Sequence, residues 1–244
     1  MKPSRIRRFA LDALCALIPL MAAAHGAEEP RSTAGPIVVE LFTSQGCSSC
    51  PPADQLLGEL ASRPNVIALG FHVDYWDDIG WRDRFSMTEA TQRQRRYVGT
   101  LGLPSAFTPQ LVINGRESFV GSDRRRIVAA LSPPALSVPI EVKVDGGELV
   151  VSLPDAEAHR GYELNLAAYL PRATTAIGRG ENSGRTLTEF DVVLQFQRLG
   201  EWHGKSRTLR VSLNTLPDEA SRVAILLQAG DGGPIAGAAS AIIR

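Results

Sequence analysis

The sequence predicts an α/β domain over residues 36–133, followed by an all-β, sandwich-like domain over residues 137–244. Strand and helix patterns alternate in the first segment, whereas strand patterns with little helical periodicity between them fill the second. Two prolines, Pro133 and Pro134, separate these patterns. Hydrophobic residues make up 44% of the 244 residues, which is enough for a packed core.

The charge balance argues against a nucleic acid partner. Lysine and arginine together number 26, and aspartate and glutamate together also number 26. The chain therefore lacks the global positive excess that attracts phosphate backbones or anionic membrane surfaces.

The first 27 residues have the pattern of a secretory signal peptide, with basic residues, then a mostly apolar stretch, then small residues. This pattern predicts cleavage after Gly26 or Ala27 and a periplasmic or secreted protein; an uncleaved anchor is the alternative. Because no later stretch approaches the roughly 18 apolar residues of a membrane span, we expect no stable membrane span after signal cleavage.

The first domain is expected to open with strand, helix, strand. Compact apolar runs at residues 37–42 and 66–73 predict two buried strands. Between them, apolar residues recur at helical spacing from Pro51 onward. Proline is tolerated at this position, since the first backbone N–H groups of a helix have no helical acceptor.

Further helices and a hairpin are expected to complete the first domain. Residues 87–101 predict a helix, and Asn114-Gly115 favours a tight turn between strands at 111–113 and 117–120. Residues 123–131 predict the last helix. The helix over 87–101 is expected to be basic on its exposed side, which forms either a solvated face or a partner-binding surface. Its basic residues are Arg93, Arg95 and Arg96.

Seven strand patterns follow residue 137, with turn residues such as Asp145-Gly146-Gly147 between them. They cover residues 138–144, 148–153, 162–170, 187–199, 208–213, 222–228 and 235–243.

Cys47 and Cys50 are the only cysteines expected in the mature chain, because Cys15 falls in the predicted signal peptide. A disulfide between them persists in an oxidising compartment, but it closes too short a loop to stabilise the fold much. At a helix start, the helix dipole and free N–H groups favour the thiolate of the leading cysteine. We therefore expect Cys47 to be a nucleophile that another molecule can reach, and Cys50 to be the resolving thiol.

The residues Gly46-Cys47-Ser48-Ser49-Cys50-Pro51 after a buried strand, with Thr108-Pro109 before the next sheet segment, resemble the thioredoxin superfamily. The resemblance covers residues 36–132 and implies an α/β thioredoxin-like domain followed by the all-β domain. It also implies a cis bond at Pro109, packed against Cys47, and a substrate contact through Thr108.

Over its whole length, the chain also resembles a bacterial and plant family of exported proteins of unknown function. The resemblance is carried by Phe71-His72-Val73-Asp74-Tyr75-Trp76 and by Gly180-Glu181-Asn182-Ser183-Gly184-Arg185-Thr186. It implies an architecture but no activity.

Two departures from thioredoxins bear on the expected site. Gly46 stands where thioredoxins typically have tryptophan, and the spacer is Ser-Ser, so the resemblance implies no redox potential. Glu40 lies one residue out of register with the buried carboxylate that accepts a proton in thioredoxins. It is a candidate catalytic residue, and an ion-paired strand carboxylate is the alternative.

His72 and Asp74 fall at the end of the second predicted strand, and Trp76 follows them. The carboxyl ends of strands in an open α/β sheet face the ligand crevice, so all three are candidate substrate-binding residues. The alternatives are a structural role for His72 and interior packing for Trp76.

These patterns favour a thiol–disulfide oxidoreductase that needs no cofactor and acts on disulfides of exported proteins or small thiols. Its redox partner is unknown, and homodimerisation stays open. One alternative is a copper-binding module in which His72 joins the two thiolates. Another is a non-catalytic thioredoxin-like adaptor whose β domain binds a partner.

Overall fold

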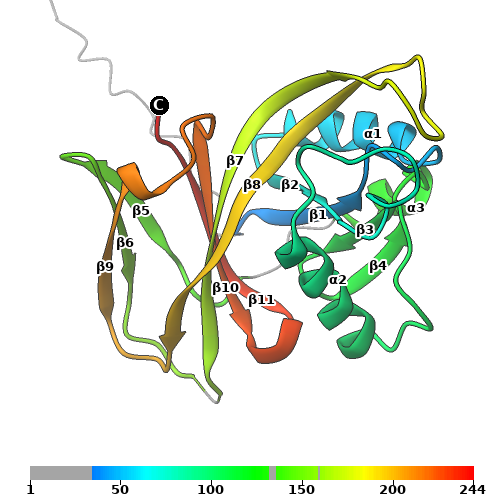
Figure 1. Ribbon diagram of the computed structural model, residues 1–244. Coiled ribbons are helices and arrows are strands. Elements are labelled where there is room, and N and C mark those ends of the chain that lie inside the picture. The colour runs from blue at the N-terminus through cyan, green and yellow to red at the C-terminus, as the bar shows by residue number, and fades with distance from the viewer. Residues whose placement is uncertain (1–34, 132–135, 159) are drawn as a thin grey trace, which may run out of the picture. The chain divides into compact units, whose positions relative to one another are not determined.

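The computed structural model describes residues 35–131, 136–158 and 160–244. Within them the protein is mostly β, with eleven strands, three α-helices and two short 3-10 helices (Figure 1). In chain order the elements are β1 (Ile37–Thr43), α1 (Pro51–Ala61), β2 (Val66–His72), α2 (Thr88–Thr100), β3 (Gln110–Ile113), β4 (Glu117–Val120), α3 (Arg124–Ala130), β5 (Glu141–Asp145), β6 (Glu148–Leu153), β7 (Tyr162–Ala176), β8 (Thr186–Trp202), β9 (Arg207–Ser212), η1 (Leu213–Thr215), β10 (Arg222–Ala229), η2 (Gly230–Gly232) and β11 (Ile235–Ile242). The predicted fold class, an α/β thioredoxin-like domain followed by an all-β, sandwich-like domain, is therefore wrong.

A single mixed sheet of eight strands is the reason. Its order is β11-β10-β7-β8-β2-β1-β3-β4, so it joins strands from both halves of the chain. The junction lies between β2 and β8, which run parallel and pair at Gly70 and Val192. Local patterns predict that strands exist but do not reveal which strands pair, so they could not show that the two halves share one sheet.

Two glycines allow β8 to lie close to β2 and α1. A Cβ atom at Gly70 on β2 would lie 3.0 Å from the carbonyl oxygen of Phe190 on β8. At Gly58 on α1, a Cβ atom would lie 2.7 Å from the Phe190 ring. A side chain at either position would push β8 away from β2 or α1.

β1 is buried along its whole length because both faces of the sheet are covered there. Its odd-numbered residues, Ile37, Val39 and Leu41, pack with apolar residues of α1. Val38 and Phe42 point to the opposite face, where they pack with α2. The two faces of β1 thus separate the surroundings of α1 from those of α2.

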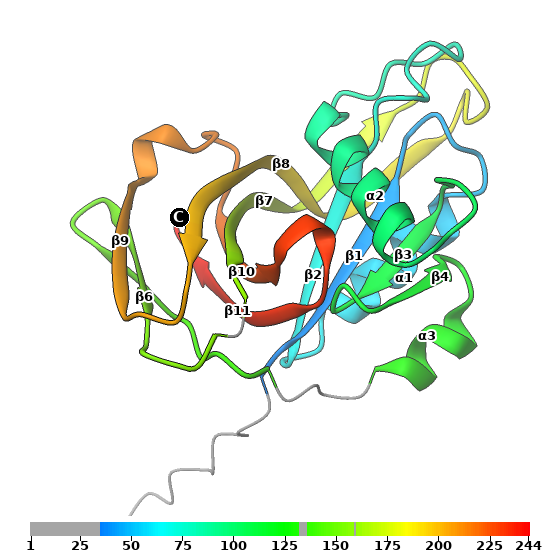
Figure 2. The same ribbon diagram turned by 90° about the horizontal axis from the view of Figure 1, so that it is seen from below.

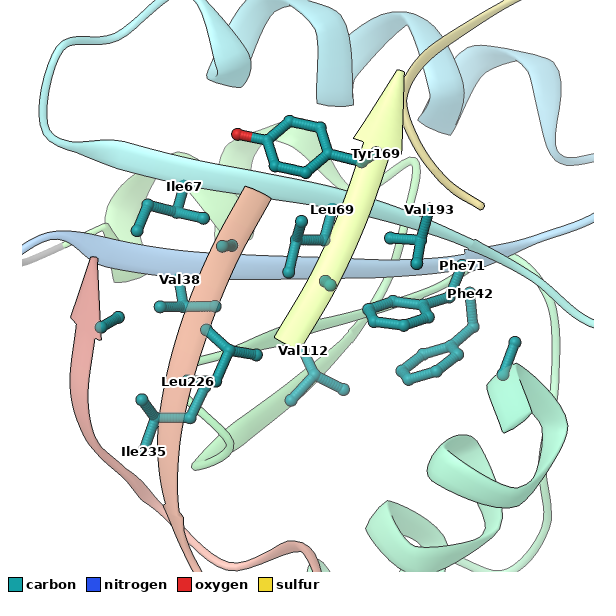
Figure 3. Packing of buried hydrophobic residues seen from close by; sticks show 14 of the residues in the cluster. Val38, Phe42, Ile67, Leu69, Phe71, Val112, Tyr169, Val193, Leu226 and Ile235 are labelled. Atoms are coloured by element: carbon teal, nitrogen blue, oxygen red, sulfur yellow. The ribbon is translucent and has the colours of Figure 1, made fainter. Parts of the chain in front are cut away.

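The core on the α2 face is shared by the two halves of the chain. Figure 3 shows Val38 and Leu69, from β1 and β2, packed with Tyr169, Val193 and Leu226, from β7, β8 and β10. Apolar surface of the first half is therefore buried against strands of the second half.

A second sheet has three antiparallel strands in the order β5-β6-β9. Its apolar residues pack against β7 and β10 of the large sheet. Each of the seven predicted strand patterns after residue 137 overlaps one of the strands β5 to β11, although β7 and β8 are longer than predicted. The domain limits 36–133 and 137–244 meet at residues 132–135, which lie outside the described residues, and they stay a prediction. The signal peptide at residues 1–27 also lies outside them. No helix in the described part of the chain is long and apolar enough to cross a bilayer.

Candidate functional site

The cysteine pair lies where β1 ends and α1 begins. A disulfide joins Cys47 and Cys50, whose Cα atoms are 5.4 Å apart. Cys50 is the N-cap of α1, and Pro51 and Pro52 occupy its first turn. The prediction that a helix begins at the cysteines is confirmed.

Pro109 lies beside the first turn of α1. The Thr108–Pro109 peptide bond is cis, as the thioredoxin resemblance implies. A Cβ atom at Gly121 would lie 3.0 Å from the Cβ of Pro109 and 3.1 Å from the Cβ of Ala53 on α1. The absence of a side chain at Gly121 thus allows the cis-proline Pro109 to lie next to α1.

Trp76 connects Thr108 to the segment between β1 and α1, residues 44–50, which we call the cysteine loop. Its indole N–H donates a hydrogen bond to Thr108 Oγ1 (2.9 Å). A Cβ atom at Gly46 would lie 3.2 Å from the Cβ of Trp76, so the residue before Cys47 is in contact with this tryptophan. Trp76 and Thr108, two of the candidate substrate-binding residues, therefore lie together next to the motif.

The disulfide is closed off from solvent. Both Cys47 and Cys50 are 0% exposed, although Ser48 and Ser49 between them are exposed. The turn between β7 and β8, residues 177–185, lies beside the start of α1 in both views (Figures 1 and 2). We call this segment the hairpin tip. The expectation that another molecule reaches Cys47 directly is wrong for this conformation.

Three hydrogen bonds tie the hairpin tip to the cysteine loop. The buried side chain of Asn182 donates to the backbone carbonyls of Gln45 (2.9 Å) and Cys47 (3.0 Å). The Glu181 carboxylate accepts a hydrogen bond from the backbone N–H of Ser48 (3.0 Å). The hairpin tip is therefore fixed to the backbone beside Cys47, and we expect it to move before another molecule reacts with this sulfur.

An open groove of about 500 Å³ runs along the exposed side of the motif. Its lining includes Ser48, Pro51 and Gln55 on one side and Arg185 and Leu187 of the hairpin on the other. Because Ser48 belongs to the motif itself, a segment lying in this groove would be next to the disulfide.

Comparison with known proteins identifies the family. Residues 38–228 match the family described as "Protein of unknown function (DUF1223)". The chain belongs to this family. No curated protein matches the sequence of this DUF1223 protein.

Two solved structures resemble this DUF1223 protein. The crystal structure of a protein from Agrobacterium tumefaciens has 31% sequence identity and a TM-score of 0.75, with 86% of this chain and 96% of that chain covered. HBP35 of Porphyromonas gingivalis has 13% identity and a TM-score of 0.57, with 86% of this chain and 76% of that chain covered, and this similarity concerns the fold alone.

Buried polar residues gather at the carboxyl ends of β1 and β2, on the face that carries α1. Thr43 and His72 are register partners at these ends. The Thr43 hydroxyl donates to Asp54 on α1 (2.8 Å), and His72 Nδ1 lies 2.7 Å from Asp83 Oδ2. His72 is 1% exposed and paired with Asp83, an arrangement typical of a structural histidine, and its role in substrate binding stays a prediction.

Burial and charge act in opposite directions within this group. Burial lowers the pKa of His72, but the charge and hydrogen bond of Asp83 outweigh it and raise this pKa to about 9. Burial raises the pKa of Asp54 to about 7, although the His72 charge opposes the rise. Burial also raises the pKa of Glu189. His72 is thus an imidazolium at neutral pH that faces several buried carboxyl groups.

Gln45 links these polar residues to the cysteine loop. Its backbone N–H donates to Asp83 (2.7 Å), and its side-chain amide donates to Glu189 on β8 (2.9 Å). Its side-chain oxygen accepts from the indole of Trp81 (3.0 Å). Gln45, two positions before Cys47, is therefore fixed by hydrogen bonds to three different residues.

Glu40 and Asp74 do not lie with the cysteines. Glu40 points to the α2 face of β1, where Arg93 pairs with it (2.5 Å between Nε and Oε1), which is the ion-paired alternative. The expectation of an exposed Arg93 is wrong, since this side chain is only 2% exposed. Asp74 accepts hydrogen bonds from Thr88 and Thr91 at the start of α2.

Sequence reasoning missed the residues that hold the site together. Asn182 contacts Cys47 from 135 positions further along the chain. The segment around Asn182 contributed to the family resemblance, but no local pattern connects it with the cysteines. Asp54 and Asp83 carried no signal either, because a single carboxylate in a helix or loop usually faces solvent.

Replacing Asp54 with asparagine is expected to stabilise the protein increasingly as pH rises. The ordinary pKa of 3.8 is raised to about 7 in the folded protein, so the folded state binds more protons between these values. The contribution of Asp54 to wild-type stability then falls as pH rises from about 4 to 7, by at most about 4 kcal/mol. Urea unfolding at several pH values measures the difference. Asp78→Asn, at an exposed position, is the control; equal pH dependence in Asp54→Asn and wild type would contradict the expectation.

Proposed function

We propose that this DUF1223 protein is a thiol–disulfide oxidoreductase that acts through Cys47 and Cys50. The observation that carries the proposal is the cysteine pair at the start of α1, with the cis-proline Pro109 beside the same helical turn. The positive end of the helix dipole at such a position favours a thiolate. The groove beside Ser48 provides room for a substrate segment.

The proposed chemistry is disulfide exchange. The Cys47 thiolate attacks one sulfur of a substrate disulfide and forms a mixed disulfide, while the other substrate sulfur leaves as a thiolate that takes up a proton. The Cys50 thiolate then attacks the Cys47 sulfur, which releases the second substrate thiol and reforms the Cys47–Cys50 disulfide. Two electrons pass to the substrate, and a thiol reductant must restore the pair; the reverse sequence oxidises a substrate dithiol.

The setting of this chemistry is also a proposal. We infer an exported, periplasmic or secreted protein from the signal-peptide pattern, with disulfides of exported proteins or small thiols as substrates. We further infer that the segment from β1 to α3 is a distant relative of the thioredoxin superfamily. The cysteine pair after a buried strand and the cis bond at Pro109 support this relationship.

A non-catalytic adaptor is the second candidate, and one observation favours it. Cys47 and Cys50 are 0% exposed, as expected for a disulfide that never exchanges. In this case the hydrogen bonds of Asn182 would hold a permanently closed structure. Among the described residues, no group of three His, Cys, Asp or Glu side chains is arranged to hold a metal ion, so nothing favours the copper-binding alternative.

Trapping of a mixed disulfide distinguishes the two candidates. The Cys50→Ser variant retains the nucleophile but not the resolving thiol, so incubation with glutathione disulfide is expected to leave glutathione bound at Cys47. Mass spectrometry of the intact protein and of its peptides measures this adduct. Cys47→Ser is the matched control and is expected to form at least tenfold less adduct. If neither variant forms an adduct while both remain folded, the adaptor is supported and the oxidoreductase is not.

A further inference from the structure

Glu181 of the hairpin tip brings a negative charge to the cysteine motif. Its carboxylate accepts a hydrogen bond from the backbone N–H of Ser48 (3.0 Å), the residue directly after Cys47. Hydrogen bonding from the side chain and backbone of Ser48 lowers the pKa of Glu181 below its ordinary value, so the group is ionised at neutral pH. An exposed acidic side chain thus occupies the backbone donor of the residue after Cys47, two residues before the N-cap of α1.

Ser48 directly follows Cys47, and the hydroxyl of the next residue, Ser49, lies 3.4 Å from Cys47 Sγ. Near a helix start, a thiolate is stabilised by neighbouring backbone N–H groups that point toward it. In the oxidised protein neither sulfur carries a charge, so the carboxylate meets no repulsion there. After reduction, a thiolate at Cys47 would be repelled by the carboxylate that is bound to the next residue, Ser48.

We propose that Glu181 competes with the Cys47 thiolate for the backbone N–H of Ser48 and thereby favours the disulfide over the dithiol. This inference rests on the proposed function, in which the pair is reduced and reoxidised. Reduction by a dithiol passes two electrons and two protons to the two sulfurs and converts the dithiol into a disulfide. Ionisation of the Cys47 thiol then releases a proton to water and creates the competing anion.

The competition links the redox state of the pair to the hairpin tip. Formation of the thiolate displaces Glu181 from Ser48 and removes one of the contacts that hold the tip. Asn182 still donates to the carbonyl of Cys47, so it keeps the tip near the motif. Glu181 therefore acts as a positioning residue that adjusts the redox equilibrium, and it takes no part in the exchange reaction itself.

The acid dissociation constant of Cys47 tests the competition without any exchange reaction. In the Cys50→Ser background, Cys47 is a free thiol, and the ultraviolet absorbance of the thiolate follows its ionisation. Adding Glu181→Gln removes the charge but keeps the size and an acceptor oxygen, and we expect the dissociation constant to rise about fivefold. Glu117→Gln removes an exposed charge from β4, which is paired with the Ile113 end of β3, away from the cysteines, and is the control.

The redox equilibrium provides a second readout with both cysteines present. Equilibration with a reference dithiol is expected to give Glu181→Gln a reduced-to-oxidised ratio about fivefold higher than wild type, which is about 20 mV for a two-electron couple. The difference should shrink in about 1 M salt, where the Debye length is about 3 Å. A merely structural effect of the substitution would not depend on salt in this way.

The outcomes separate this inference from the proposed function. An unchanged or smaller dissociation constant in Glu181→Gln overturns the inference, even if the wild-type protein exchanges disulfides. A larger constant supports the inference, and it does so even if the glutathione experiment shows no adduct and the proposed function fails. Glu181→Ala, measured in parallel, guards against a specific effect of the glutamine side chain and should give the same direction.

Discussion

Replacing Arg93 with methionine is expected to lower the free energy of unfolding by about 3–5 kcal/mol, because it leaves the Glu40 carboxylate buried without its counter-charge. Arg93 is 2% exposed and pairs with Glu40 on β1. It also donates to Gln228 on β10 and to the Tyr97 hydroxyl on α2, both at 3.0 Å. One guanidinium therefore connects both halves of the chain. Urea unfolding with the disulfide intact measures the loss.

Two further variants test whether this loss of stability comes from the unpaired Glu40 charge. Arg95→Met, at an exposed position of the same helix, should change stability by less than about 0.5 kcal/mol. The double variant Glu40→Leu/Arg93→Met removes both charges and should recover much of the loss, since an apolar pair often replaces a buried ion pair without cost. A loss below about 1 kcal/mol in Arg93→Met would show that the pair does not stabilise the fold as described.

Local signals were sufficient for the elements around the cysteines. The apolar run of β1 and the helical spacing of Leu56, Leu57 and Leu60 are properties of short segments, and both elements occur where expected. Asn114-Gly115 is a further example, since both residues have positive φ between β3 and β4. Proline chemistry restricts the chain locally as well, and the cis bond at Pro109 followed from the resemblance.

Contacts between distant segments could not be derived in this way. The pairing of β2 with β8 depends on the shape of the whole sheet, and the glycines Gly58 and Gly70 that permit it resemble any other glycine in the sequence. Arg93 was expected in solvent because its partner, Glu40, lies 53 positions away. The hydrogen bond between Asn182 of the hairpin tip and the Cys47 carbonyl was missed for the same reason.

Replacing Asn182 with alanine is expected to accelerate reduction of the Cys47–Cys50 disulfide by at least about tenfold. The variant loses the two hydrogen bonds from Asn182 to the carbonyls of Gln45 and Cys47. Each is worth about 1 kcal/mol, and tenfold corresponds to about 1.4 kcal/mol. The population with the hairpin tip displaced should therefore rise at least by this factor. Quenched sampling during reduction by dithiothreitol, followed by alkylation and mass spectrometry, measures the rate.

Ser183→Ala is the matched control for this experiment. Ser183 lies in the same hairpin tip, but its hydroxyl donates to the carbonyl of Gly178 within the tip (3.2 Å) and leaves the cysteine loop untouched. Its rate of reduction should equal that of wild type. If Asn182→Ala is reduced no faster than Ser183→Ala, these hydrogen bonds do not control access to Cys47.

The rate at which wild-type protein is reduced under native conditions tests the central claim most directly, namely that movement of the hairpin tip makes Cys47 reactive in the folded protein. We expect reduction by dithiothreitol to be much faster than global unfolding measured on the same sample, to increase with dithiothreitol concentration over part of the range, and to reverse on oxidation with the fold retained. Reduction that occurs only at the rate of global unfolding, at any dithiothreitol concentration, would mean that the disulfide is a closed structural bond.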